Sequence, residues 1–437
     1  MTALRNRLIR GGIASLAIRV GSIALTLAGS VVLARALGVA GYGAYALAMS
    51  TMSILAIPVH AGLPTLVLRE TAAADTHGDL ARMKGIWAWA ARIVLATSAL
   101  LLIGCAAAWF FRPSLVPAVF ALSMGLVPLV AAGAVRAAAL KGLRHVVAAQ
   151  LPDNVVRPGL LAAGVAGAAW IAGGALTAET AMALHLGAAL CGFAVGAAFL
   201  LRVRPEGLRS VSADMTESRA WLRALVPIAL ISGMQVLNQN AGLVIIGLLR
   251  PDADAALYRV ALSASAFVLI GLQVITLPFE PLFVRAHQSH DMAGLQKAAS
   301  ASAASGFLAS VPLAAAFWAG GAWLLGLLYG SAYADAAGLL SILVLGQMVR
   351  SYFGSCETVL VLTGHETQSM RIWIAAIAIG LALSVGLGLR HGAIGVAWAG
   401  VISATIIRAG QWLAVRRLLG IDTALHSSFA FARARAA

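Results

Sequence analysis

The sequence is poor in charged residues, and acidic residues are the scarcest of them. Only 16 of the 437 residues are Asp or Glu, and none lies between Met1 and Arg69. Charged residues make up 11% of the chain and hydrophobic residues 61%, with a mean hydropathy of +0.91, whereas soluble domains are about half apolar and a quarter charged. A soluble fold could not bury so much apolar surface, so we expect an all-α polytopic membrane protein.

Cysteine and the common catalytic motifs are also nearly absent. Cys105, Cys191 and Cys356 fall in apolar stretches without CxxC spacing, which indicates neither a disulfide framework nor a metal site. The sequence contains no GxxxxGK[ST], HExxH or GxSxG motif, and the predicted spans contain no pair of carboxylates at helix-face spacing. We therefore predict that the protein is not an enzyme and needs no metal or other cofactor.

The formal net charge of +15 raises the question of nucleic acid. Basic proteins bind nucleic acid by neutralising its phosphates, but they carry their charge in a basic stripe or beside a zinc-ligand pattern. Here the arginines lie between apolar stretches or inside them. We therefore expect membrane lipids, and no nucleic acid, as the surroundings of this chain.

Polar residues, Gly and Pro divide the chain into about twelve apolar stretches, each long enough to cross a bilayer that needs roughly 20 residues per helix. The first six are expected near residues 12–34, 43–67, 86–111, 115–139, 154–174 and 179–201. The next six are expected near residues 221–248, 257–283, 301–328, 334–361, 370–389 and 392–415.

The distribution of Lys and Arg supports these spans, because cytoplasmic loops are enriched in both residues. With twelve spans, nearly all the loop Lys and Arg fall on one side. The other side receives only Arg35, Arg112, Arg250 and Arg390. We therefore predict a multi-pass protein of a bacterial inner membrane with both termini in the cytoplasm.

The most polar internal stretch, RVRPEGLRSVSADMTESR, divides the predicted helices into two sets of six. We predict an N-terminal lobe over residues 1–201, a cytoplasmic linker over 202–220 and a C-terminal lobe over 221–437. Two halves with an even number of helices have the same orientation, so a repeat would be parallel. The short basic tail after Leu419 is expected to be solvated or to contact lipid headgroups.

Ionisable residues inside membrane spans are costly and usually face a bundle interior or a water-filled cavity. In this chain almost all of them are arginines: Arg19, Arg92, Arg136, Arg350 and Arg408. No mid-span acidic residue is available to neutralise the first three. Arg binds phosphate in a bidentate geometry, so we predict that these five arginines bind an anionic substrate. The alternative for Arg92, Arg136 and Arg408 is that they extend to nearby headgroups.

Polar side chains also recur at helical spacing in three predicted spans. The stripes are Ser15, Arg19, Ser22, Thr26 and Ser30; Ser232, Gln235 and Gln239; and Gln347, Ser351, Gly354 and Thr358, with Arg350 beside them. We predict that Gln235, Gln239 and Gln347 contact a glycan. The alternative is that these groups only join one helix to another.

Three acidic residues lie nearest to the membrane in this topology: Asp153, Glu280 and Glu357. Each falls toward a cytoplasmic helix end and is a candidate site for a coupling ion. Simple pairing with Arg157 or Arg285 is the alternative interpretation of these carboxylates.

Several segments resemble the polysaccharide or oligosaccharide (Wzx-like) flippases of the multidrug/oligosaccharidyl-lipid/polysaccharide (MOP) flippase superfamily. Residues 31–50, VVLARALGVAGYGAYALAMS, are similar to the family pattern ARxLGxxxYGxYxLA, and residues 61–70, AGLPTLVLRE, to the GLxxxxxRE segment that follows it. Residues 277–286, LPFEPLFVRA, and 363–371, TGHETQSMR, resemble two helix ends of the second half. The resemblance implies a MATE-like MOP fold.

The same resemblance implies a function. It is the translocation of an undecaprenyl-pyrophosphate-linked oligosaccharide repeat unit, for O-antigen, capsule or exopolysaccharide, by alternating access through a cationic cavity. Arg19 matches the first-helix cation of the family and of the related lipid II flippases. The acidic partner and the thirteenth and fourteenth helices of lipid II flippases are missing here, which argues against a peptidoglycan precursor. A polysaccharide polymerase and chain-length machinery are possible partners.

Two other classes of function stay open from the sequence. A cation-coupled multidrug or metabolite antiporter of the same superfamily needs a buried acidic residue for its ion, and the first helix offers none. A non-transporting scaffold of a polysaccharide-assembly complex would not need the intramembrane arginines. The effect of removing these charges separates the three classes.

Overall fold

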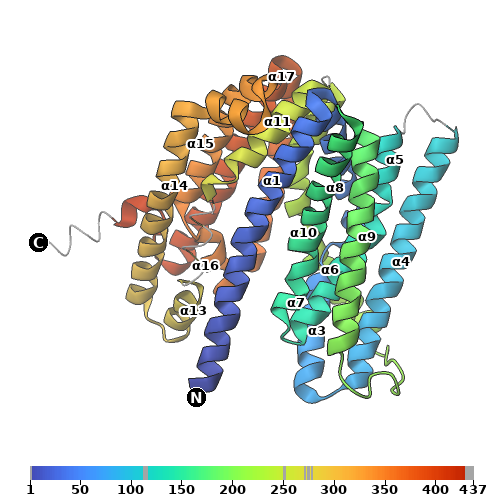
Figure 1. The fold of residues 1–437 in the computed structure, drawn as a ribbon. Helices are drawn as coiled ribbons and strands as arrows, with labels where there is room; N and C mark the ends of the chain where they lie inside the picture. Colours follow the sequence, from blue (N-terminus) through green and yellow to red (C-terminus); the bar gives the residue numbers. More distant parts are fainter. Residues whose placement is uncertain are drawn as a thin grey trace, which may run out of the picture. The chain divides into compact units, whose positions relative to one another are not determined.

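A computed structural model gives the fold of the chain (Figure 1). It describes residues 2–111, 117–249, 252–269, 272, 276 and 279–428. The side chains of residues 2–20, 252, 280, 281 and 284 lie outside this description. The predictions for Arg19 and Glu280 therefore concern side chains that the structure does not describe.

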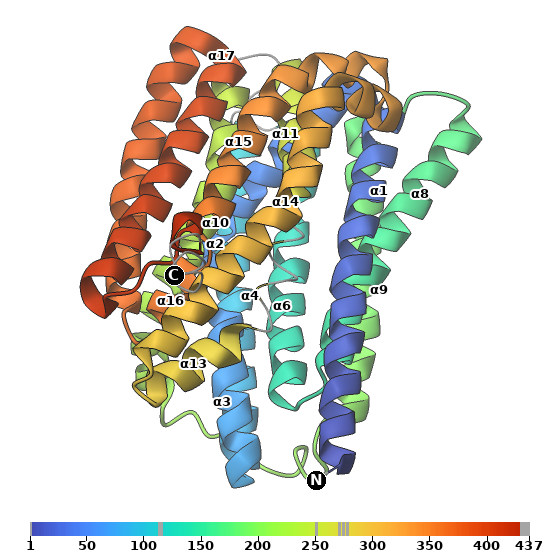
Figure 2. The same ribbon diagram turned by 90° about the vertical axis from the view of Figure 1, so that its left-hand side faces the viewer.

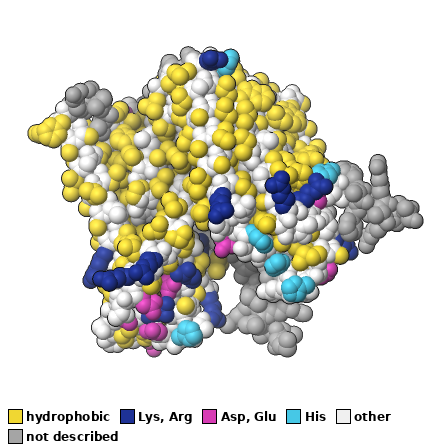
Figure 3. Space-filling view, turned by 180° about the vertical axis from the view of Figure 1, so that it is seen from behind, with side chains coloured by type: hydrophobic (Ala, Val, Ile, Leu, Met, Phe, Trp, Pro, Cys, Tyr) yellow, Lys and Arg dark blue, Asp and Glu magenta, His cyan; other side chains and the backbone are white. Residues whose placement is uncertain are grey.

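The described residues form helices joined by turns and loops, with no strand among them. Nine of these helices are long and apolar enough to cross a membrane. Large apolar side chains such as Leu100 (73% exposed) and Trp170 (85%) point outward, as lipid-facing side chains should. Figure 3 shows hydrophobic side chains over much of one face. The prediction of an all-α polytopic membrane protein is confirmed.

The chain divides into two compact units, Met1–Asn240 and Ala241–Ala437. The division falls inside helix α10, which runs from Ser218 to Leu249. The predicted lobes over 1–201 and 221–437 stay a prediction.

The elements that precede α10 belong to the first unit. They are α1 (Thr2–Leu55), α2 (Ile57–His60), α3 (Leu63–His77), α4 (Leu80–Phe111), α5 (Ala118–Met124), α6 (Leu126–Gly142), α7 (Val146–Leu151), the π-helix η2 (Pro152–Val156), α8 (Arg157–Ala172) and α9 (Ala178–Val203). The elements after α10 belong to the second unit. They are α11 (Asp252–Ser265), α13 (Glu280–Gln288), α14 (Met292–Tyr329), the 3-10 helix η4 (Ser331–Ala336), α15 (Ala337–Phe353), α16 (Cys356–Leu362) and α17 (Glu366–Leu419).

Helix α17 is a hairpin of two legs rather than one continuous rod. Gly392 has φ 61° and ψ −141° and interrupts the helical backbone. Across this break Ser403 donates a hydrogen bond to the Ala376 carbonyl at 3.2 Å, so the legs pack antiparallel, as Figure 2 shows. Helix α1 contains a similar break at Gly38. The count of twelve spans stays a prediction.

Two predicted spans, 43–67 and 334–361, are broken rather than continuous, and the prediction of their continuity is wrong. The first is interrupted at Gly62, where φ is +78°, and the second at Gly354, where φ is +63°. Only glycine adopts such backbone angles at little cost. The interruption at Gly354 separates α15 from α16 and is central to the site described below.

The predicted linker is folded onto the first unit. Lys84 donates hydrogen bonds to the carbonyl oxygens of Arg209 and Val211 at 3.1 and 2.6 Å, and Leu208 is buried at 6% exposure. The Asp214 carbonyl lies so close to Gly85 that a side chain there would clash with it. The segment thus lies against the start of α4.

The C-terminal segment is also packed, which corrects the expectation of a solvated tail for residues 420–428. The Thr423 and Ala424 side chains are fully buried, and Gln296 exchanges two hydrogen bonds with the Asp422 backbone at 2.6 and 2.7 Å. Residues 429–437 lie outside the described residues. The Thr423 carbonyl of this segment lies against Gly354, at the break between α15 and α16.

Candidate functional site

Arg350 lies in the last turn of α15, four residues before the break at Gly354. The carbonyl groups at a helix C-terminus carry partial negative charge, which stabilises a nearby cation. A side chain on Gly354 would approach the Thr423 carbonyl at 2.8 Å and Ala303 at 2.9 Å. The positive φ and the close packing both require glycine, so the helix ends where Arg350 can point into the protein.

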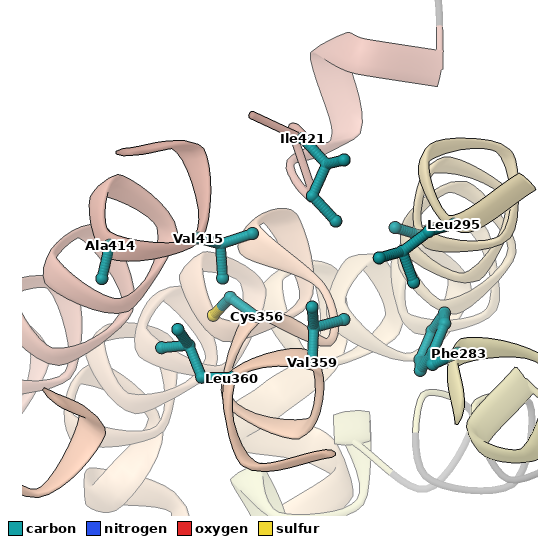
Figure 4. Packing of buried hydrophobic residues seen from close by; sticks show 9 residues of the cluster. Phe283, Leu295, Cys356, Val359, Leu360, Ala414, Val415 and Ile421 are labelled. Atoms are coloured by element: carbon teal, nitrogen blue, oxygen red, sulfur yellow. The ribbon is translucent and has the colours of Figure 1, made fainter. Parts of the chain in front are cut away.

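The short helix α16 has one anchored face and one open face. Cys356, Val359 and Leu360, at spacing i, i+3 and i+4, are fully buried in a cluster with residues of α13, α14 and α17 (Figure 4). Residues three and four apart share a helix face. Glu357 and Thr358 therefore point away from this cluster, toward a cavity.

Both legs of helix α17 contribute side chains to the site. Arg408 on the second leg donates to the Gln411 amide oxygen at 3.2 Å, and Gln411 donates to Ser369 on the first leg at 3.0 Å. Trp373, also on the first leg, donates from Nε1 to Oε1 of Glu357 at 3.1 Å. The other carboxylate oxygen of Glu357, Oε2, lies 3.0 Å from Nη1 of Arg408. Each of the two carboxylate oxygens is therefore held by a different partner.

These side chains meet at a cavity of about 340 Å³ in the second unit. Its polar lining consists of Arg350, Ser355, Glu357, Thr358 and Arg408, together with Thr276 and the backbone of Gly354, and leucines and a valine complete the wall. Arg350 has no hydrogen-bond or ion-pair partner among the described residues. Among the described lining residues, two arginines and one glutamate give a formal charge of +1, so this part of the cavity is suited to an anion.

Arg136 in the first unit is also paired, and the expectation that it lacks an acidic neighbour is wrong. Its Nη2 lies 2.9 Å from Oδ2 of Asp153, and its Nη1 donates to the carbonyl oxygens of Gly192 and Phe193 at 3.3 and 2.9 Å. A side chain on Gly196 would clash with the guanidinium. Arg136 is therefore enclosed by protein, at 5% exposure.

The pairing arises because the chain departs from regular helix geometry. Residues Pro152–Val156 form the π-helix between α7 and α8, and π-helical insertions re-aim side chains relative to an α-helix. Asp153 in this segment reaches Arg136 rather than Arg157, the partner suggested by sequence proximity. Glu357 likewise pairs with Arg408 rather than with Arg285.

The remaining predicted residues lie elsewhere. Arg92 is exposed and donates to the Met215 sulfur at 3.1 Å, and Gln235 and Gln239 are exposed on α10. Gln347 lies one turn before Arg350, and its buried Oε1 has no hydrogen-bond partner in the described part of the chain. Of the polar stripe with Gln347, Ser351 is hydrogen-bonded to Ser310 of α14 at 3.2 Å, as a contact between helices.

Sequence reasoning missed three residues that organise the cavity: Ser355, Trp373 and Gln411. The spacing of Arg408 and Gln411, three residues apart, places both on one helix face and is a usable signal. Trp373 lies 16 residues from Glu357 and beyond a turn. Nothing in the local pattern predicts their hydrogen bond.

Comparison with known proteins identifies relatives of the chain. The model of a family described as "Polysaccharide biosynthesis protein" matches residues 8–287. No curated protein sequence matches the chain.

Several solved structures have a similar fold. An inward-facing multidrug resistance MATE family transporter of the MOP superfamily has a TM-score of 0.74 and 16% identity, over 93% of this chain and 98% of the other. The lipid II flippase MurJ, in an inward closed conformation, has a TM-score of 0.70 and 13% identity, over 93% and 87%. A MOP superfamily transporter from Pyrococcus furiosus has a TM-score of 0.65 and 13% identity, over 95% of both chains. The predicted MOP fold is confirmed, and these folds are those of transporters and flippases rather than enzymes.

Proposed function

Because the chain belongs to the polysaccharide biosynthesis protein family, we propose that it is a flippase for an undecaprenyl-pyrophosphate-linked oligosaccharide repeat unit. The repeat unit crosses the inner membrane for O-antigen, capsule or exopolysaccharide synthesis, by alternating access. Arg350 and Arg408 bind the pyrophosphate. The family and the fold support a membrane transporter or flippase. The identity of its substrate is the part that we propose.

The observation that carries this proposal is that Arg350, which has no hydrogen-bond or ion-pair partner among the described residues, lies beside Arg408 in one cavity. A cation inside a membrane protein is costly and usually marks a substrate or ion pathway. Guanidinium groups bind phosphate oxygens bidentately with short, charge-assisted hydrogen bonds. Two arginines from different helices supply enough donors for a pyrophosphate, and the hydroxyl of Thr358 is available for its oxygens or for the first sugar.

The surroundings of Glu357 favour this substrate over the cation of an antiporter. A coupling cation needs carboxylate oxygens that are free to coordinate it. Both oxygens of Glu357 are held, one by Trp373 and the other by Arg408. Glu357 would have to leave Arg408 before it could bind a cation, and the net positive charge of the cavity opposes cation entry.

The other predicted residues keep narrower roles in this proposal. Gln235, Gln239 and Gln347 are proposed to contact the glycan, and Arg19 to attract the pyrophosphate at an earlier stage of transport. Arg136 and Asp153 are proposed to stabilise the first unit. A polymerase and chain-length machinery remain proposed partners.

The proposal is tested by complementing a deletion host with wild type, Arg350→Gln or Arg408→Gln at matched membrane levels. Each variant removes one guanidinium, and we expect surface polysaccharide to fall at least about tenfold, since losing one partner of a buried charge contact costs 2–5 kcal/mol or more. Repeat units should accumulate on the cytoplasmic leaflet. Arg371→Gln, on the exposed side of α17, is the matched control and should complement fully.

Three results would assign the protein differently. Normal polysaccharide in the deletion strain would exclude the flippase. Full complementation by both cavity variants would support a scaffold role instead. Unchanged polysaccharide combined with increased drug sensitivity in the deletion strain would favour the antiporter.

A further inference from the structure

Glu357 presents a problem for a cavity that binds an anion. Its carboxylate occupies Arg408, one of the two cations that the pyrophosphate needs, with Oε2 at 3.0 Å from Nη1. A carboxylate and a phosphate oxygen use the same guanidinium edge. They therefore compete for Arg408, whereas Arg350 is available without competition.

Resting on the proposed function, we propose that Glu357 is an internal competitor of the substrate, which leaves Arg408 when the pyrophosphate binds and returns when it departs. Arg350 makes the first contact with the anion. The pyrophosphate then takes Arg408, and the Glu357 carboxylate turns away while Oε1 keeps its hydrogen bond to Trp373. After release, Glu357 neutralises Arg408 again.

Such exchange solves a difficulty of cation-lined transport sites. Two unneutralised arginines in a membrane would hold a pyrophosphate too tightly for release, and a transporter must bind its substrate weakly enough to let it leave. An internal carboxylate lowers the net gain of binding because its own ion pair must break first. It also avoids leaving two buried arginines unpaired between transport events.

The neighbours of Glu357 are arranged for movement of one side chain only. Gln411 is fully buried and bridges Arg408 to Ser369, so Arg408 stays in place when Glu357 moves. Glu357 itself has 26% side-chain exposure against 11% for Arg408. The carboxylate is therefore the member of the pair with room to turn.

The proposal predicts opposite changes in binding and transport when Glu357 loses its charge. Inorganic pyrophosphate is titrated calorimetrically into the purified full-length protein in nanodiscs of neutral lipid. Glu357→Gln should bind pyrophosphate about tenfold more tightly, because the competing ion pair is gone. The same variant should export less lipid-linked glycan, because release becomes slow. Glu366→Gln, an exposed neutralisation at the start of α17, is the matched control and should change neither quantity.

A second variant separates competition from a merely structural role and keeps the test valid if Glu357→Gln folds poorly. Trp373 donates to Oε1 of the paired carboxylate and, in the proposal, is the partner that remains after displacement; Trp373→Phe therefore costs the displaced carboxylate more than the paired one, and Glu357 should compete harder for Arg408. Pyrophosphate should then bind about threefold more weakly. A structural role of the Trp373–Glu357–Arg408 chain would instead give changes of the same sign in both variants.

The outcomes distinguish this inference from the proposed function. If wild type binds pyrophosphate through Arg350 but Glu357→Gln binds it no more tightly, competition by Glu357 is wrong and the anion site stands. If neither wild type nor Glu357→Gln binds pyrophosphate, both proposals fail. Tighter binding together with faster export in Glu357→Gln would also overturn the role in release.

Discussion

A buried arginine has different surroundings in each of the two units. Arg136 in the first unit meets Asp153, two carbonyl oxygens and the ring of Phe193 at 5.7 Å. Arg408 in the second unit meets Glu357 and Gln411 beside a cavity that is also lined by Arg350, which has no such partner in the described part of the chain. The same residue type therefore has a structural environment in one unit and a binding environment in the other.

The difference teaches that an intramembrane arginine is informative only together with what surrounds it. Burial alone does not separate the two cases, because both guanidinium groups are largely shielded, at 5% and 11% side-chain exposure. Arg136 is neutralised by a carboxylate through Nη2 and held by two backbone carbonyls through Nη1, and only its Nε lacks a hydrogen-bond partner among the described residues. An arginine that lines a cavity with more cationic than anionic side chains can bind an external anion. The predictions below test this distinction.

The largest effect on stability is expected for Asp153→Asn. The substitution leaves the buried Arg136 without its counter-charge; because Asp153 itself is 30% exposed, we expect a loss of about 3 kcal/mol, the lower end of the range for breaking a buried ion pair. Glu357→Gln should cost less than half as much, because Arg408 keeps Gln411 and lies beside a cavity that water can enter. Thermal unfolding of the two purified variants in the same detergent measures the difference. Equal losses would contradict the distinction between the two pairs.

Gly354→Ala should have the next largest effect, about 2–3 kcal/mol. An L-residue at φ +63° is strained, and the new methyl group would meet the Thr423 carbonyl and Ala303. Gly364→Ala is the matched control, since φ there is +81° but no atom lies within 4 Å of the added carbon. The unfolding midpoints separate the steric cost from the backbone cost. An unchanged midpoint for Gly354→Ala would show that the α15–α16 break is not fixed by glycine.

Gly196→Ala in α9 should destabilise the protein by about 2 kcal/mol, because the added methyl group displaces the Arg136 guanidinium from a closely packed position. Gly187→Ala in the same helix has open space around it and should be neutral or slightly stabilising, since Ala favours helix. Both are compared by thermal unfolding. If Gly196→Ala matched Gly187→Ala, the enclosure of Arg136 would be looser than described.

Arg350→Gln should have the smallest effect on stability, about 1 kcal/mol or less. The change breaks no hydrogen bond or ion pair among the described residues, and it removes a like charge near Arg408. Arg136→Gln should instead lower the unfolding midpoint clearly. A large stability loss in Arg350→Gln would show that this residue also has a structural role and would weaken its assignment to the substrate.

Much of the fold follows from the sequence because hydropathy and the Lys/Arg distribution are properties of whole segments. Arg350 and Arg408 were also predicted as candidate residues from the sequence, together with Arg19, Arg92 and Arg136, since a lone arginine in an apolar span is conspicuous; the sequence did not predict that these two line one cavity. The breaks at Gly62 and Gly354 could not be predicted from the sequence. Glycine is frequent throughout this chain, with 45 residues, and only tertiary packing determines which of them adopt a positive φ.

The acidic partners of the arginines could not be predicted from the sequence either. Asp153 reaches Arg136 through a π-helical segment, which a regular helical wheel cannot represent. The Glu357–Arg408 pair joins residues 51 positions apart, and its geometry depends on the hairpin of α17. Sequence patterns locate charges along a helix, but tertiary contacts decide which charges neutralise one another.

The central claim is that the cavity with Arg350 and Arg408 carries the pyrophosphate of the lipid-linked substrate. It is tested most directly by leaflet-resolved flipping in proteoliposomes, with an undecaprenyl-pyrophosphate-linked oligosaccharide and protein as wild type or as the Arg350→Gln/Arg408→Gln double variant. We predict that wild type moves the lipid to the opposite leaflet and that the folded double variant is at least about tenfold slower. Equal rates for the two proteins would contradict the account.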